Sequence, residues 1–115
     1  MKAFGYTNNS KILSSESINA IELETPTASG HDLLVEIRAI SVNPVDTKIR
    51  AKVAPENGVK VLGWDASGTV VSVGNEVTLF SPGQKVFYAG DITRAGCNSE
   101  YHLVDELIVG HAPEK

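Results

Sequence analysis

One group of residues that could do chemistry lies in a glycine-rich stretch, VLGWDASGTVVSVG, at residues 61–74. A dinucleotide-binding loop needs the pattern G-x-G-x-x-G between a strand and a helix, so that phosphate meets the free N–H groups of the helix. Here the pattern is G-x-D-x-x-G, and the residues that follow it, TVVSV, are typical of a strand. We therefore exclude a phosphate loop and interpret Gly63 and Gly68 as glycines that permit a tight corner between strands.

A second group of polar residues lies in the segment NPVDTKIRAKV, residues 43–53. The segment is predicted to form a short helix, because apolar residues recur at every fourth position: Val45, Ile49 and Val53. Asn43 stands where an N-cap belongs, and Pro44 suits the first helical position. Asp46 is placed to pair with Arg50 one turn later on the helix surface.

The candidate metal ligands are few and scattered. The chain contains three histidines and one cysteine, at His31, His102, His111 and Cys97, and they show no ligand spacing. His102 falls within a predicted strand, where we expect a surface or hydrogen-bonded histidine. Cys97 has no base adjacent in sequence, so an unremarkable thiol is expected. A single cysteine also excludes an internal disulfide and fits a reducing compartment.

The elements that must position these residues are predominantly strands, because the dominant hydrophobic period along the chain is two. Alternation occurs in five runs, at residues 20–24, 33–43, 68–73, 85–89 and 100–104. In the second run, the face expected to be buried consists of Leu33, Val35, Ile37 and Ala39. Short half-buried strands separated by turn residues predict an antiparallel sandwich or small barrel. The predicted fold class is mainly β, with one or two short helices.

Length and charge narrow the class of protein further. The chain has 115 residues, the length of one domain, and a formal net charge of −4 without a cluster of Lys or Arg. The chain therefore lacks the basic patch with which nucleic-acid-binding proteins contact phosphates. The sequence has no signal peptide and no run of about 20 apolar residues, so we expect no membrane association and a cytoplasmic location.

The glycine-rich stretch and its continuation resemble the signature of the medium-chain dehydrogenase/reductase superfamily. The match is greatest with its quinone oxidoreductase branch, which includes proteins named zinc-type alcohol dehydrogenase-like. The matching residues are Gly63-x-Asp65-x-x-Gly68-x-Val70-x-x-x-Gly74-x-x-Val77-x-x-x-x-x-Gly83-x-x-Val86. Three further stretches agree in order: MKAFGY at the start, SVNPVDTKIR, and GCNSEYHLVDE. The resemblance covers essentially the whole chain.

The resemblance implies a GroES-like β-barrel over residues 1–115, as the N-terminal part of a catalytic domain. The family's Rossmann domain, which binds the nicotinamide cofactor, is then not present in this chain. We therefore expect this fragment alone to be inactive. Because family dimers commonly pair through that second domain, the full-length protein is expected to be a homodimer.

The resemblance also indicates whether the residues at the family's zinc-ligand positions could bind zinc. Zinc-dependent members use a Cys in the turn that here reads SVNPVD and a His in the motif that here reads GWD. Those positions hold Asn43 and Trp64, and neither an amide nor an indole is a usual zinc ligand. We expect no zinc, and a reaction that needs no strong Lewis acid. Hydride transfer from NADPH or NADH to a small-molecule acceptor, a quinone or an activated enone, fits that requirement.

By the same resemblance, Asn43 and Pro44 face the nicotinamide end of the cleft, and Asp46 lies nearby as a second catalytic candidate. Two alternatives stay open for these residues: Asn43 as a plain helix cap, and Asp46 as a surface partner of Arg50. Trp64 is expected either in the acceptor pocket or in the core. Lys48 stands where many relatives have Tyr at the pocket, and it is expected to be solvated rather than catalytic.

A function of another class is consistent with the same residues. A freestanding GroES-like barrel can act as a binding or assembly module, as in the co-chaperonins. The two hypotheses differ in whether the gene continues into a βαβ segment with a glycine-rich turn.

Overall fold

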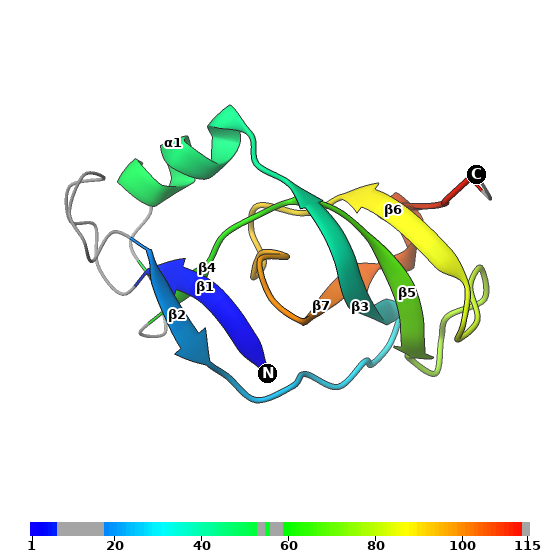
Figure 1. Cartoon of the computed structure of the whole chain (residues 1–115). Helices are drawn as coiled ribbons and strands as arrows, with labels where there is room; N and C mark the ends of the chain where they lie inside the picture. The colour runs from blue at the N-terminus through cyan, green and yellow to red at the C-terminus, as the bar shows by residue number, and fades with distance from the viewer. Residues whose placement is uncertain (7–17, 53–54, 56–58, 114–115) are drawn as a thin grey trace.

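The computed structural model describes residues 1–6, 18–52, 55 and 59–113 and contains two antiparallel sheets (Figure 1). The smaller sheet has the order β2-β1-β4, and the larger has the order β7-β3-β5-β6-β8. The strands are β1 (Lys2–Tyr6), β2 (Asn19–Glu22), β3 (Asp32–Ser41), β4 (Lys60–Val61), β5 (Asp65–Val73), β6 (Lys85–Ala89), β7 (Tyr101–Asp105) and β8 (Val109–His111). The mainly-β, GroES-like class predicted from the sequence is confirmed.

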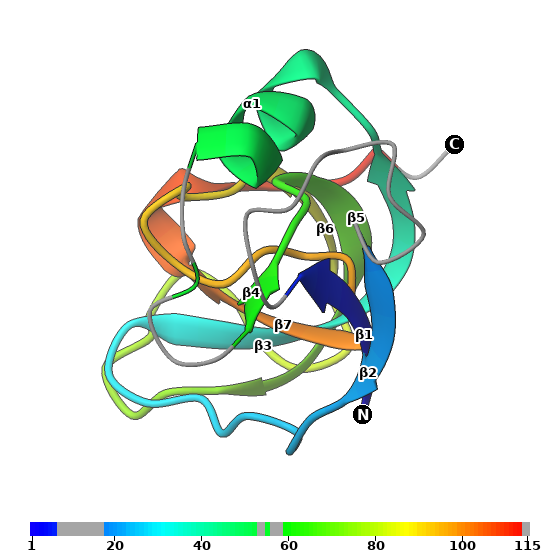
Figure 2. The same cartoon turned by 90° about the vertical axis from the view of Figure 1, so that its left-hand side faces the viewer.

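The helical content is one α-helix and one 3-10 turn in the described part of the chain, again as predicted. The helix α1 (Pro44–Lys52) follows β3, and the turn η1 (Glu106–Ile108) follows β7. Both views place α1 at one end of the molecule, beside the small sheet (Figures 1 and 2). Val53, expected to continue the apolar face of α1, lies outside the described residues. Of the helices in the described ranges, none has the length and apolar content to span a bilayer.

The core consists of two clusters of buried side chains. The larger one combines side chains of the five-stranded sheet with two from loops, Phe80 and Cys97. Its sheet residues are Leu33, Val35, Ala66, Val70, Val86, Tyr88 and Val104. The smaller one joins α1 to the other sheet: Val45 and Ile49 of α1 pack against Tyr6, Leu62 and Trp64. The helix is therefore held by its apolar side, as its sequence period predicts.

The buried face of β3 departs from the prediction at its far end. Leu33 and Val35 are fully buried and Ile37 is partly buried, as expected, but Ala39 is exposed. The pairing of β3 with β5 shifts register between Ile37 and Ala39, so that one extra residue, Arg38, interrupts the alternation. Such a bulge turns the following side chains relative to the strand. The prediction for Ala39 was therefore wrong.

Glu106 ties the 3-10 turn to two loops. Its side chain is 2% exposed, and its Oε1 accepts hydrogen bonds from the backbone N–H groups of Thr78 (3.1 Å) and Leu79 (2.9 Å). Its Oε2 lies 2.7 Å from Nδ1 of His31. The His31 ring and these N–H groups hold the pKa of Glu106 below its usual value. The buried carboxylate thus has its hydrogen-bonding capacity satisfied.

Gly68 and Gly63 confirm the sequence interpretation that these glycines permit close backbone packing. A Cβ at Gly68 would collide with the carbonyl oxygen of Glu36 on β3 and would lie 2.7 Å from a methyl group of Val35. Gly63 has φ of 97°, a conformation that other residues rarely adopt. Both glycines border the segment that carries Trp64 and Asp65.

We predict that Gly68→Ala lowers the free energy of unfolding by about 1–3 kcal/mol, because a methyl group there must push β5 away from β3. Gly110→Ala is the matched control, since the three atoms nearest to its Cβ would belong to the Phe87 ring, which is 51% exposed, and not to backbone. Chemical denaturation of both variants measures the difference. Equal stability of the two variants would contradict the close approach at Gly68.

Candidate active site at the start of α1

The pairing of β3 with β5 brings Asn43 beside Asp65. Ser41, the last residue of β3, lies opposite Asp65, the first residue of β5, and Asn43 follows two residues later. The side-chain Nδ2 of Asn43 donates a hydrogen bond to Oδ2 of Asp65 at 2.6 Å and another to the carbonyl oxygen of Ser41 at 3.2 Å. Two residues far apart in sequence thus meet at the point where the chain turns into the helix.

The two partners determine which way the Asn43 amide faces. A carboxylate and a backbone carbonyl are acceptors only, so the –NH2 group of Asn43 must face them. The other end of the amide, Oδ1, then faces away, and no donor of the described residues forms a hydrogen bond with it. Asn43 therefore offers a free acceptor oxygen at the edge of the sheet.

Asp46 caps the helix from inside its first turn. Its Oδ2 accepts a hydrogen bond from the backbone N–H of Asn43 at 2.7 Å, while its own N–H donates to the carbonyl oxygen of Asn43 at 3.0 Å. Asn43 occupies the predicted cap position, but its side chain does not make the capping bond, because the side chain is engaged by Asp65. The carboxylate three residues later makes the reciprocal half of a capping box instead.

The hypothesis that Asp46 is a surface partner of Arg50 was wrong, because both residues are buried. Asp46 is 7% exposed and Arg50 is 2% exposed. Among the ion pairs of the described residues, none joins the two side chains. Arg50 stacks over the Tyr6 ring instead, with its guanidinium carbon 4.8 Å from the ring centroid. The second oxygen of Asp46, Oδ1, is buried and has no hydrogen-bond partner among the described residues.

Trp64 lies in the smaller core cluster. It is 3% exposed and its indole N–H donates to the carbonyl oxygen of Asp91 at 3.0 Å. Of the two alternatives left open by the sequence, this burial favours the core, and a part for Trp64 in an acceptor pocket stays a prediction. Pro44 and Lys48 are both exposed on α1, which agrees with a solvated Lys48.

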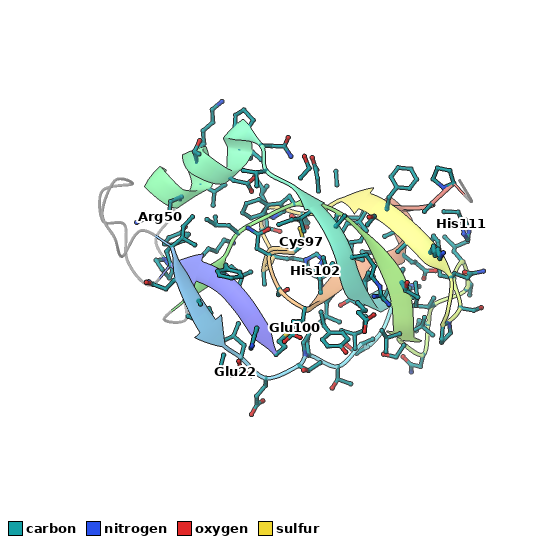
Figure 3. All side chains as sticks on the ribbon, in the orientation of Figure 1. Glu22, Arg50, Cys97, Glu100, His102 and His111 are labelled. Atoms are coloured by element: carbon teal, nitrogen blue, oxygen red, sulfur yellow. The ribbon has the colours of Figure 1, made fainter. Side chains whose placement is uncertain are left out.

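The histidines and the cysteine are occupied elsewhere. His102 is buried, its Nε2 donates to the carbonyl oxygen of Ala95 at 2.9 Å, and its Nδ1 accepts from the Tyr88 hydroxyl at 2.7 Å. Burial lowers the pKa of His102, which keeps the ring neutral. Figure 3 shows His102 and Cys97 in the interior and His111 at the far edge of the molecule. Within the described ranges, no three His, Cys, Asp or Glu side chains are grouped so as to hold a metal ion.

A pocket of about 470 Å³ is lined by Asp65, the carboxylate that holds the Asn43 amide. It lies over β3, β5 and β6, and both partners of Asn43, Ser41 and Asp65, line it. Ile40 and Phe87, which are 44% and 51% exposed, form apolar parts of its wall. A larger pocket of about 580 Å³ between β1 and β3 contains neither of these partners. The smaller of these two pockets thus combines an apolar wall with the two hydrogen-bond partners of Asn43.

Comparison with known proteins shows which family the chain belongs to. Residues 29–113 match the alcohol dehydrogenase GroES-like domain, and the chain belongs to that family. It is 46% identical to a zinc-type alcohol dehydrogenase-like protein of Staphylococcus aureus (strain COL), over 98% of this chain and 34% of that protein. The chain therefore spans about a third of the length of the curated relatives it matches.

Two solved structures have the same fold. A crystal structure from Rhizobium etli CFN 42, named as a proposed zinc-dependent alcohol dehydrogenase protein, has a TM-score of 0.97 and 53% identity, covering 100% of this chain and 34% of that one. The Escherichia coli quinone oxidoreductase complexed with NADPH has a TM-score of 0.83 and 26% identity, covering 98% of this chain and 33% of that one. The predicted membership of the medium-chain dehydrogenase/reductase superfamily is confirmed.

Sequence reasoning missed the contact on which the site depends. Asp65 was noticed only as part of the G-x-D-x-x-G pattern, and its hydrogen bond to Asn43 could not be read from spacing. The signal that could have found it is the strand register, because two antiparallel neighbours bring the end of one strand to the start of the other. The buried pair of Tyr88 and His102 gave no sequence signal beyond strand alternation.

We predict that the Cys97 thiol does not react with Ellman's reagent in the folded protein at pH 8. Cys97 is fully buried, and burial raises the pKa of its thiol to about 12, so almost no thiolate forms at that pH. The same protein unfolded in guanidinium is the control and should titrate one thiol per chain. Rapid labelling of the native protein would contradict the buried position.

Proposed function

We propose that this chain is the substrate-side part of an oxidoreductase that transfers a hydride from NADPH or NADH to a quinone or an activated enone. The Rossmann domain that binds the nucleotide would lie elsewhere in a longer polypeptide. Two findings support this: the relatives are about three times as long as the chain, and a neighbour of the same fold is a quinone oxidoreductase complexed with NADPH.

The observation that carries the proposal is the Asn43 carboxamide held by Asp65 beside an apolar pocket. The hydrogen bond of 2.6 Å fixes a neutral polar group at the position where zinc-dependent relatives have a thiolate. An amide oxygen suits hydrogen bonding to an N–H or O–H of a nucleotide and suits zinc poorly, because zinc prefers thiolate, imidazole and carboxylate. The residues present therefore fit a nicotinamide ligand better than a metal ion.

The proposed reaction makes modest demands on the chain's own residues. The reduced nicotinamide, when bound, supplies the hydride, and a conjugated acceptor spreads the incoming charge over its own π-system. What the chain contributes is positioning: Ile40 and Phe87 cover an apolar ring and keep water from it, and Asn43 orients a polar group at its edge. Asp46 fixes the backbone of Asn43 and stays a catalytic candidate only as a prediction.

We predict that the purified protein retains no stoichiometric zinc after dialysis against a weak chelator, in spite of the zinc in its relatives' names. Asn43 and Trp64 replace the thiolate and the imidazole, and the buried Trp64 indole is already engaged with Asp91. Elemental analysis measures the metal content. Introducing the ligands by Asn43→Cys and Trp64→His provides a comparison. About one tightly held zinc per wild-type chain would contradict the proposal.

The Asn43→Ala variant tests the proposed function in the intact protein that joins this chain to a nucleotide-binding domain. Loss of one hydrogen bond in a dry site should lower kcat/KM for quinone reduction by roughly 10- to 100-fold, equivalent to about 1.4–2.8 kcal/mol. Thr47→Ala is the matched control on the same helix, because Thr47 is exposed and bonds only to the Pro44 carbonyl oxygen.

Thermal unfolding of the same variants separates catalysis from stability. Since Asp46 makes the capping bond, Asn43→Ala should destabilise the fold only through the lost contact with Asp65. Unchanged kcat/KM together with a lowered Tm would show that Asn43 has a structural role alone and would contradict the proposal.

A further inference from the structure

We propose that Asp65 is a positioning residue that selects which end of the Asn43 amide meets the ligand, so that the site binds a hydrogen-bond donor of the reduced nicotinamide nucleotide. The donor is an N–H or an O–H, from the carboxamide or from a ribose hydroxyl. The inference rests on the proposed function and adds to it the residue that sets the specificity of the contact.

The two ends of the Asn43 amide face in different directions. Both hydrogens of Nδ2 point toward acceptors, Oδ2 of Asp65 at 2.6 Å and the Ser41 carbonyl at 3.2 Å. The bond to Asp65 is the shorter one and involves a carboxylate, which makes it the stronger of the two. Turning the amide over would place Oδ1 against two acceptors, so the orientation with Oδ1 outward is enforced.

Asp65 lies on a paired strand, whereas Asn43 lies in a connector. Asp65 begins β5 and is paired on both sides, with Ser41 of β3 and Ala89 of β6. Asn43 lies between β3 and α1, next to Val42, which is 77% exposed. A side chain on a strand that is paired on both sides thus orients a side chain on the connector to the helix.

The outward oxygen of Asn43 determines which groups of a ligand can form a hydrogen bond with it. The outward oxygen of Asn43 is a hydrogen-bond acceptor, so it can bind a nicotinamide carboxamide N–H or a ribose O–H. A quinone oxygen is itself a hydrogen-bond acceptor and therefore gains nothing from it. The Asn43 oxygen should therefore contribute to the affinity for the nucleotide and leave the affinity for a quinone nearly unchanged. Without Asp65, the amide can rotate and offer either end.

The experiment measures the dissociation constant for NADPH in the intact protein, by fluorescence titration, for the wild type and for three variants. Asp65→Ala should weaken NADPH binding about tenfold, the size of one hydrogen bond. Asp65→Asn keeps an acceptor oxygen for Asn43 and should remain within about threefold of the wild type. Glu36→Ala is the matched control, because it removes a strand carboxylate that pairs with Arg38 instead of Asn43.

A second readout does not depend on activity. In nitrogen-15 NMR spectra of the protein without ligand, the side-chain amide of Asn43 should be strongly shifted in the wild type. It should move to an ordinary position in Asp65→Ala and stay shifted in Asp65→Asn. The dispersion of the backbone amide resonances in the same spectra shows separately that each variant is folded. An Asn43 amide whose resonance is the same in Asp65→Ala would overturn the positioning role.

The two donor sources are distinguished with the reduced 3-acetylpyridine analogue of NADPH, which lacks the carboxamide N–H. If the carboxamide is the donor, the wild type binds the analogue about tenfold more weakly than NADPH, and Asp65→Ala loses this preference. If a ribose hydroxyl is the donor, both ligands lose affinity equally in Asp65→Ala. Either result supports the proposal.

Three results would overturn it: Asp65→Ala binding NADPH like the wild type, Asp65→Asn failing as badly as Asp65→Ala, or a larger change in quinone KM than in nucleotide affinity. A wild-type protein that binds neither NADPH nor NADH would instead refute the proposed function. The NMR comparison would then still decide whether Asp65 orients the amide.

Discussion

The antiparallel pairing of β3 with β5 is the constraint on which the rest of the site depends. It places Ser41 opposite Asp65, and the close approach of the two strands is possible because Gly68 carries no side chain. The end of β3 and the start of β5 then meet at one edge of the sheet. The connector to α1 begins there, so the polar group on Asn43 can reach Asp65.

Two different interactions hold the helix α1 in place, and neither of them uses the side chain of Asn43. Asp46 makes the capping bond to the backbone, and apolar residues of α1 pack against the small core cluster. Because capping does not use the Asn43 side chain, that side chain is free to bond with Asp65 and to present its oxygen outward. By the resemblance set out above, Asn43 stands where zinc-dependent members have a thiolate, and we propose that hydrogen bonding takes the place of metal chemistry there.

Much of the fold was predictable because it depends on local patterns. Alternation located the long strands, and the four-residue period located α1, with Asn43 at its cap and Pro44 as its first residue. The failures depend on contacts between distant residues. The bulge that exposes Ala39, the burial of Asp46 and the partnership of Asn43 with Asp65 arise from strand register and core packing. Candidate residues could therefore be named from the sequence, but not the direction in which their polar atoms face.

The most direct test of this account is a crystal structure of the intact protein with reduced nicotinamide nucleotide, with anomalous data collected at the zinc edge. The account predicts that the Asn43 Oδ1 lies about 3 Å from an N–H or O–H of the nucleotide while Nδ2 keeps its bond to Asp65, the usual length of such a hydrogen bond. It also predicts no anomalous peak between Asn43 and Trp64. A metal ion at that position, or an Asn43 amide that has turned its nitrogen toward the nucleotide, would contradict the account.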